Sequence, residues 1–287
     1  MAAQRNLLPG GRWFFQHGPM DIVIGADGEH AALVAAHEAA WQRFQSLLDE
    51  LVGELPKLRS PVVAATNPLD GVVARRMWSA CYPYRSSFIT SMAAVAGAVA
   101  DELIASYQRA GIRRAWVNNG GDIALHLTPQ QSFNVGLYAD IARFDRQQAQ
   151  DGIKLDGSFS ISATMPVRGI ATSGWRGRSF SLGIADSVTV LARTAAQADA
   201  AATVIANAVN VDDPRIVRRP ACDIKDDSDL GNIPVTVQVP ALSAAKVAQA
   251  LRAGTQRARE LRAAGLIGSA ALTCQGMLAT TEALALS

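Results

Sequence analysis

The feature that most constrains the fold is an apolar run over residues 117–125 that breaks on Asn-Asn-Gly-Gly-Asp and then resumes. Two consecutive glycines adopt a positive φ at little steric cost, and the flanking Asn and Asp tolerate the same conformation. The pattern therefore predicts a strand, a tight turn and a second strand, which is a β-hairpin.

The turn itself has two interpretations. Asn-Gly turns are common, so the segment can be only a hairpin. Alternatively, backbone N–H groups exposed at Asn119, Gly120 and Gly121 form the edge of a pocket for a nucleotide or a metal-bound phosphate. In that case these three are candidate ligand-binding residues, and the carboxylate of Asp122 is a candidate catalytic group. The turn alone does not decide between the two.

Composition narrows the class of protein. The chain has 287 residues, of which 49% are apolar and 18% charged, so it can bury a large globular core. A net charge of +2 argues against nucleic acid or a membrane surface as a partner. Cys81, Cys222 and Cys274 are too dispersed for a disulfide framework or a zinc site. With no secretory signal and no spanning apolar run visible, we expect a cytoplasmic protein.

Periodicity predicts further elements, and together they indicate an α+β protein. Apolar positions at helical spacing predict a helix over 30–52, with His37 as a hydrogen-bonded residue on its buried stripe. Residues 53–87 contain several prolines and are expected to be a long irregular connection. The other expected elements are strands at 12–16, 21–24, 133–138, 185–191 and 235–239, a small-residue helix over 89–109, and a helix capped by Ser243 that extends to about 264. We expect the turn and the start of the small-residue helix to share an edge.

Residues 169–181 form a second informative segment, which combines glycines, hydroxyls and two arginines in what we expect to be one short loop. Arginine forks and exposed backbone donors suit phosphate or carboxylate. An ordinary solvated basic turn is the alternative. The candidate ligand-binding residues are Thr172, Ser173, Gly174, Arg176 and Arg178.

The third segment is a predicted helix in which Asp199, Thr203 and Asn207 lie four residues apart and share a face. Such oxygen-bearing side chains suit Mg²⁺, which is usually held by one or two protein carboxylates together with phosphate and water. Alternatively, Asp199 interacts favourably with the dipole of its own helix, and Thr203 bonds a carbonyl one turn back.

Taken in order, these segments resemble a known family. The runs at 118–122, 171–174, 187–190 and 198–203 look like the successive signatures of the ApbE superfamily, the FAD:protein FMN transferases. The resemblance is closer to an uncharacterised cytoplasmic ApbE-like branch and is strongest over 85–276. It implies one ApbE-like domain over 1–287, with mixed or antiparallel sheets packed with helices in two intertwined lobes. It also implies a pocket for FAD or FMN, with Mg²⁺ held near the pyrophosphate by Asp199 and Thr203.

The chain also departs from the family pattern. The transferases carry a His-x-x-Asp-Pro segment before the strand that matches 187–190, whereas residues 175–186 contain no histidine. Ala96 and Thr90 stand where a lysine and an aspartate are expected. These differences argue against the standard FMN-transfer mechanism and leave Asp122 and Asp186 as the candidate catalytic acid or base.

Two classes of function remain. The first is an ApbE-like enzyme that acts on a flavin nucleotide or another small anion, including an altered reaction such as hydrolysis of a carboxylated metabolite. The second is a non-catalytic flavin or small-molecule binding protein. In either case the expected partner is a small anionic molecule, and alanine-rich helices of this kind could pair in a homo-oligomer.

Overall fold

The fold is α+β, with antiparallel sheets packed with helices. The computed structural model describes residues 2–63, 65–137 and 157–281. The chain forms two compact units, each assembled from three separate segments. The first contains Met1–Ser132, Ser162–Ala171 and Leu191–Ala200, and the second contains Phe133–Ile161, Thr172–Val190 and Ala201–Ser287. Strands β8 (Gly169–Ser173) and β9 (Ser187–Ala192) each begin in one unit and end in the other, so the two units are intertwined along the chain.

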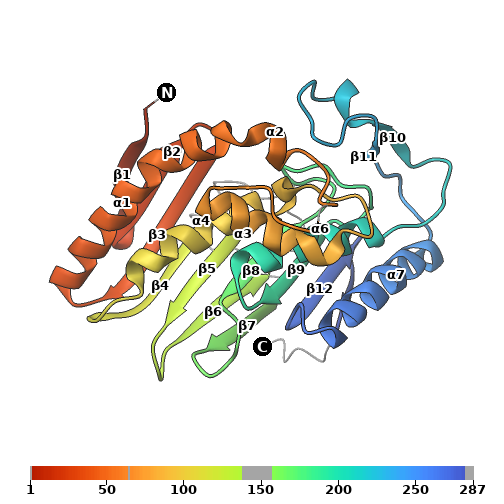
Figure 1. The fold of residues 1–287 in the computed structure, drawn as a ribbon. Coiled ribbons are helices and arrows are strands. Elements are labelled where there is room, and N and C mark those ends of the chain that lie inside the picture. Colours follow the sequence, from red (N-terminus) through yellow and green to blue (C-terminus); the bar gives the residue numbers. More distant parts are fainter. Residues whose placement is uncertain (1, 64, 138–156, 282–287) are drawn as a thin grey trace. The chain divides into compact units, whose positions relative to one another are not determined.

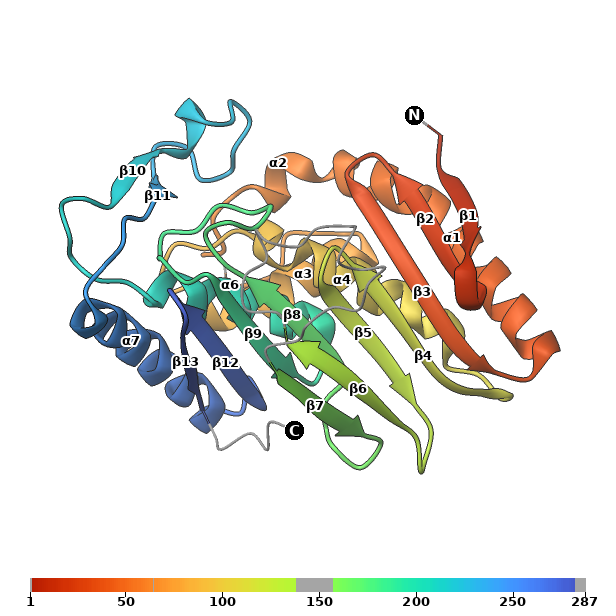
Figure 2. The same ribbon diagram turned by 180° about the vertical axis from the view of Figure 1, so that it is seen from behind.

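The sheet of the first unit is an antiparallel meander of five strands, extended by the start of β8. Each strand pairs with the next, and β5 then pairs with β8 through Ile123 and Ile170. Figure 2 shows these strands from the side opposite the helices. The strands are β1 (Gln4–Leu8), β2 (Arg12–His17), β3 (Met20–Gly28), β4 (Ile112–Asn119) and β5 (Asp122–Leu127). The predicted hairpin and the two predicted N-terminal strands are confirmed, while β1 was not predicted.

Helices cover one face of this sheet (Figure 1). Helix α1 (His30–Gly53) packs on β2 and β3, and α4 (Val95–Ile104) packs on β4 and β5. Phe44, Leu47 and Leu51 of the predicted stripe are buried, whereas Val34 is exposed. Ala36 and Ala40, which the spacing of large apolar residues did not mark, complete the buried face. His37 bonds the Tyr107 hydroxyl through Nδ1 at 2.7 Å, as expected for a core histidine.

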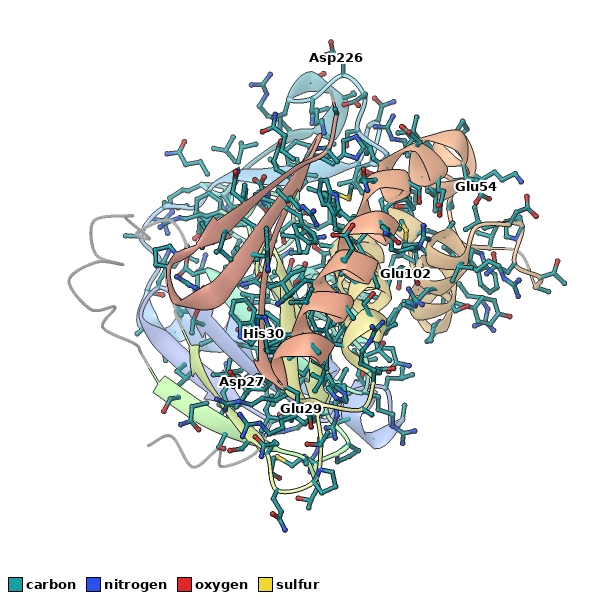
Figure 3. The ribbon with its side chains drawn as sticks, turned by 90° about the vertical axis from the view of Figure 1, so that its left-hand side faces the viewer. Asp27, Glu29, His30, Glu54, Glu102 and Asp226 are labelled. Atoms are coloured by element: carbon teal, nitrogen blue, oxygen red, sulfur yellow. The ribbon has the colours of Figure 1, made fainter. Side chains whose placement is uncertain are left out.

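The expected irregular connection over 53–87 is partly wrong, because it contains α2 (Leu55–Leu58) and α3 (Val72–Cys81). Helix α3 buries Met77 and packs on α4. Its N-terminus is stabilised from outside the helix, since the carboxylate of Glu54, labelled in Figure 3, accepts the N–H groups of Asp70 and Gly71 at 2.8 and 2.7 Å. A contact across this separation leaves no local sequence signal.

The small-residue helix is present but divided into η3 (Ser91–Ala94), α4 and η4 (Ala105–Tyr107). Glu102 on α4 ties three helices together. Its carboxylate, labelled in Figure 3, pairs with Arg43 of α1 at 2.7 Å and with Arg76 of α3 at 2.9 Å. A carboxylate shared between two guanidiniums fixes the relative positions of α1, α3 and α4.

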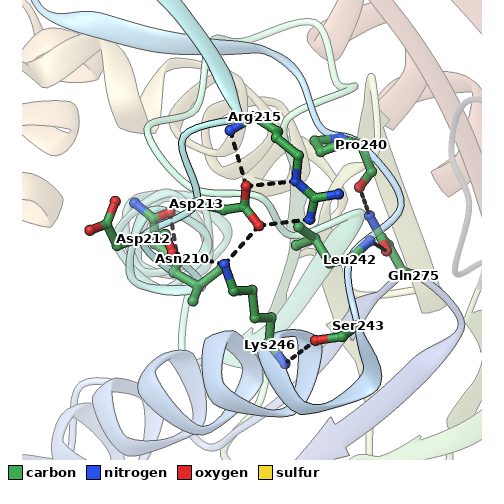
Figure 4. Close-up of polar contacts among 10 residues, drawn as sticks. Asn210, Asp212, Asp213, Arg215, Pro240, Leu242, Ser243, Lys246 and Gln275 are labelled. Atoms are coloured by element: carbon green, nitrogen blue, oxygen red, sulfur yellow. Dashed lines mark hydrogen bonds and ion pairs between the residues drawn. The ribbon is translucent and has the colours of Figure 1, made fainter.

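The second unit packs helix α7 (Ala244–Ala263) on the last two strands, β12 (Ser269–Cys274) and β13 (Met277–Thr280). Ser243 caps α7 as predicted, accepting the N–H of Lys246. The Lys246 ammonium pairs with buried Asp213 at 2.8 Å, and Arg215 pairs with the same carboxylate (Figure 4). The remaining elements are β6 (Ser132–Leu137), β7 (Gly157–Ser162), α6 (Ala195–Ala208), which starts in the first unit, β10 (Val217–Pro220) and β11 (Pro234–Gln238).

None of the described helices has the length and apolar character needed to cross a membrane.

Candidate functional site

The hairpin between β4 and β5 is a two-residue turn. Asn119 pairs with Asp122, and Gly120 and Gly121 both have positive φ, at 67° and 114°. The N–H of Gly121 donates to Oδ1 of Asn118 at 2.8 Å. This corrects the expectation that both glycines present exposed donors, because the Gly121 donor already has a partner within the turn.

Asn119 places this turn beside the start of α4. Its side chain is buried, and Nδ2 donates to the carbonyl of Ala96 at 3.1 Å. The turn and the small-residue helix therefore share an edge, as the sequence indicated.

Asp199 reaches the same edge from the first turns of α6. Its Oδ2 accepts the N–H of Gly97 at 3.0 Å, and the N–H of Ala96 also donates to the carboxylate. Asp199 therefore caps α4 and not its own helix, which is a different structural role from the dipole interaction considered as the alternative.

Asp101 on α4 makes the reciprocal contact. Its two carboxylate oxygens accept the N–H groups of Ala195 and Ala196, both at 2.9 Å, at the start of α6. Each helix thus supplies the aspartate that satisfies the free N–H groups of the other. Gly97 lies where the two backbones approach, since a Cβ on it would stand 2.3 Å from the Ala195 carbonyl oxygen. Only glycine permits this approach.

The electrostatics of this edge are dominated by two carboxylates. Burial raises the pKa of Asp199 well above its ordinary value, and the neighbouring charge of Asp122 raises it further. Burial, followed by the charge of Asp199, also raises the pKa of the Cys81 thiol. Cys81 is therefore a protonated core residue near the site and not an activated nucleophile.

The other members of the predicted helix stripe lie in the second unit. Thr203 follows Asp199 by one turn of α6 and is partly buried. Asn207 has a structural role, because its Oδ1 accepts the Leu182 N–H at 2.8 Å and faces the Ser181 hydroxyl at 3.2 Å.

The Gly-rich segment of the second unit is only partly a loop, which corrects the sequence expectation. Thr172 and Ser173 belong to β8, and the Thr172 hydroxyl bonds that of Thr189 on β9 at 2.9 Å. Gly174 allows close backbone approach, since a Cβ there would lie 2.3 Å from the Asp186 carbonyl oxygen. Beyond it, Arg176 and Arg178 are exposed.

Asp186 joins this segment to the turn between β12 and β13. Its carboxylate accepts the indole N–H of Trp175 at 3.3 Å and the backbone N–H of Gln275. The guanidinium of Arg176 lies over the Trp175 ring, 4.7 Å from its centroid. Burial and the Asp186 charge raise the pKa of the Cys274 thiol to about 12. These contacts give Asp186 a clear structural role in addition to its candidate catalytic one.

Within the described ranges, no group of three or more His, Cys, Asp or Glu side chains is arranged to hold a metal. The Asp199 carboxylate and Thr203 hydroxyl are hard oxygen donors of the kind Mg²⁺ uses. A magnesium site built on them would draw its other ligands from phosphate and water.

The chain is similar in sequence to a family model and to several known proteins. The family model described as AbpE bacteria matches residues 5–280. The chain belongs to this ApbE-like family. Among its relatives, the UPF0280 protein MK0206 of Methanopyrus kandleri is 35% identical over 209 residues, which are 72% of this chain and 78% of the relative. A UPF0280 protein of Methanothrix thermoacetophila is 30% identical over 203 residues, 70% and 78% of the two chains.

Two solved structures are also similar to this ApbE-like chain. An ApbE protein from Thermotoga maritima has a TM-score of 0.36 at 14% identity and covers 73% of this chain and 87% of its own. A mutant of the flavin transferase ApbE from Vibrio cholerae has a TM-score of 0.37 at 12% identity and covers 98% and 97%.

Sequence reasoning missed one important residue of this ApbE-like site. Asp101 follows Gly97 by four residues, so the two share a face of the small-residue helix. That spacing was visible in the sequence. Its meaning was not, because the partner N–H groups lie more than ninety residues further along the chain.

Proposed function

We propose that this ApbE-like protein binds a flavin nucleotide such as FAD together with Mg²⁺. The observation that carries the proposal is geometric: the Asp199 carboxylate accepts the Gly97 N–H at the start of α4, the edge that Asn119 of the β4–β5 turn also contacts. The charge of Asp122 on the same turn raises the pKa of Asp199 further. Neighbouring carboxylates resist simultaneous ionisation, and a divalent cation removes that penalty. The membership of the ApbE-like family supports a flavin nucleotide as the ligand that shares the cation.

The proposed Mg²⁺ ligands are Asp199 and Thr203, which offer a carboxylate and a hydroxyl one helical turn apart. The Gly97 N–H holds the Asp199 carboxylate in one orientation, so the donor is in place before a cation arrives. When bound, the metal would neutralise the charge of the nucleotide pyrophosphate.

The remaining predicted residues keep their roles within the proposal. In the first unit, the candidate ligand-binding residues are Asn119, Gly120 and Gly121, next to Asp122. In the second unit, they are Thr172, Ser173, Gly174, Arg176 and Arg178. The proposal also includes the domain organisation and the setting: residues 1–287 act as one ApbE-like domain, in the cytoplasm and as a homo-oligomer. Its partner is a small anion, and not nucleic acid or a membrane.

Transfer of FMN from FAD would break the pyrophosphate bond, join the FMN phosphate to an acceptor hydroxyl and release AMP. Asp122, or Asp186 with its established hydrogen bonds, is the candidate base for the acceptor proton. The absence of histidine from 175–186 supports a second candidate, in which flavin is bound without transfer or water replaces the protein acceptor.

Calorimetric titration with FAD in the presence of Mg²⁺ tests the binding site. We expect Asp199→Asn to weaken FAD binding by about tenfold or more, the scale of one lost charge-assisted interaction. Asp49→Asn, at an exposed position of α1, serves as the matched control and should bind as the wild type does. Equal affinity in all three proteins would refute the proposed metal site.

Chromatographic detection of AMP separates the two candidate functions. AMP released with FMN and no acceptor indicates hydrolysis, and AMP released only with a protein acceptor indicates transfer. Bound FAD that yields no AMP under either condition indicates a binding protein.

A further inference from the structure

A cleft of about 460 Å³ opens in the first unit, away from the Asp122 and Asp199 carboxylates. It is formed by α3, the C-terminal part of α4, the first turn of α6 and residues that flank β8 and β9. Among the residues of the candidate site, Asp101 lines the cleft, whereas Asn119, Gly97, Asp122 and Asp199 do not. Its size is that of a small-molecule pocket.

Three arginines and one aspartate line this cleft, and because Arg76 is paired with Glu102, the excess positive charge comes mainly from Arg168 and Arg193. The arginines are Arg76, Arg168 and Arg193, and the aspartate is Asp101. Both oxygens of Asp101 are already occupied by the N–H groups at the start of α6. The cleft therefore gathers guanidinium charge that its own aspartate only partly offsets.

Arg168 is held rigidly with part of its donor set still available. Its Nη1 donates to the carbonyls of Met165 and Val167 at 2.8 and 2.6 Å, and Nη2 donates to Ala163 at 2.9 Å. Because these acceptors are uncharged carbonyl groups, they do not neutralise the positive charge of the Arg168 guanidinium. Of its five N–H donors, Nε–H and one on Nη2 have no partner in the described part of the chain, which suits a two-point contact with an oxyanion.

Arg193 provides the most accessible charge. It lies between β9 and α6, is exposed, and forms no hydrogen bond or ion pair with the residues that the structure describes. Arg76 is more constrained, because its Nη1 contacts Glu102 and the Ala98 carbonyl. The cleft thus combines two fixed guanidiniums with one that is free to close on a ligand.

The rest of the lining is mostly apolar and includes Ala80, Ile104, Ala105, Leu125 and Ala196. We propose that this cleft is a second ligand site, which binds a small organic anion whose phosphate or carboxylate group meets the arginines and whose compact apolar body lies on Ile104 and Leu125. The site is distinct from the proposed flavin site and does not depend on it.

Calorimetry with phenyl phosphate and with benzoate tests this site on the full-length protein, and the two probes distinguish a phosphate from a carboxylate ligand. We expect at least one probe to bind the wild type at submillimolar concentration. Arg193→Gln should weaken that binding by about tenfold, and Ala105→Phe, which fills the cleft from an exposed position, should abolish it. Arg259→Gln, at an exposed arginine of α7, is the matched control and should bind normally.

Three results would overturn the inference. The first is that neither probe binds at millimolar concentration. The second is that Arg193→Gln and Ala105→Phe bind the probe as tightly as the wild type does, although their thermal midpoints show that both variants are folded. The third is loss of FAD binding when the probe is saturating, which would mean that the cleft is part of the flavin site. If the protein binds a probe but no flavin, the flavin proposal fails and the cleft stands.

Discussion

Gly97→Ala tests the contact on which the candidate site is built. A Cβ at this position would stand 2.3 Å from the Ala195 carbonyl oxygen and 2.7 Å from the Ala196 nitrogen. Real Cβ contacts are essentially never shorter than 3.0 Å, so α4 or α6 must move. Both neighbours are backbone atoms, which cannot turn aside as a side chain can.

The cost follows from three contributions. Overpacking of this kind costs about 1–3 kcal/mol. Straining the Gly97 to Asp199 hydrogen bond costs about 1 kcal/mol more, while the helix preference of alanine over glycine returns about 1 kcal/mol. The free energy of unfolding should therefore fall by about 2 kcal/mol, which lowers the thermal midpoint by about 4–8 °C.

Urea and thermal unfolding measure this change. Gly53→Ala is the matched control, because it lies at the exposed end of α1 and a Cβ there meets nothing within 4 Å. It should leave stability unchanged or raise it by up to about 1 kcal/mol. A Gly97→Ala protein as stable as the control would show that the two helices do not approach closely at this residue.

Three further predictions concern hydrogen-bonded carboxylates. Asp101→Asn should lower the free energy of unfolding by about 1–3 kcal/mol, because an amide can accept only one of the two N–H groups at the start of α6. Chemical denaturation measures this loss, with Asp49→Asn as the control. Hydrogen bonds from Arg215 and then Lys246 hold the pKa of Asp213 well below its ordinary 3.8, so its stabilisation is present above that pH and is lost below it. The stability difference between wild type and Asp213→Asn should therefore shrink as urea titrations move from about pH 7 to about pH 3. For Asp199 the pH dependence runs in the opposite direction, because its raised pKa means that the folded state binds a proton more tightly than the unfolded state. Without divalent cations, the wild type should therefore lose stability relative to Asp199→Asn as pH rises above 3.8. Added Mg²⁺ should restore that stability in the wild type only.

Local chemistry made much of the fold predictable. The Asn-Asn-Gly-Gly-Asp turn, the buried stripe of α1 and the Ser243 cap of α7 each depend on residues within one or two turns of each other. Short-range geometry decides such elements, so the sequence carries the full signal.

Helix α3 and strand β1 were missed for the opposite reason. Glu54 supports the start of α3 from outside the helix, and β1 exists because β2 offers an edge for pairing. Long-range contacts of this kind override local propensity.

The candidate site divides in the same way. The positions of Asp122 and Asp199 on a turn and on a helix could be predicted, but their mutual approach depends on Asn119, Asp101 and the bare backbone of Gly97. The arginines of the cleft come from three separated parts of the chain, and no spacing in the sequence relates them.

The most direct test of the central claim is a titration of the wild-type protein with FAD, followed by quenching of flavin fluorescence, with and without Mg²⁺. If Asp199 and the turn at Asp122 hold a cation beside the nucleotide pyrophosphate, FAD will bind much more tightly with Mg²⁺ than with EDTA. Binding that is the same in both conditions, or absent at millimolar FAD, would contradict the account.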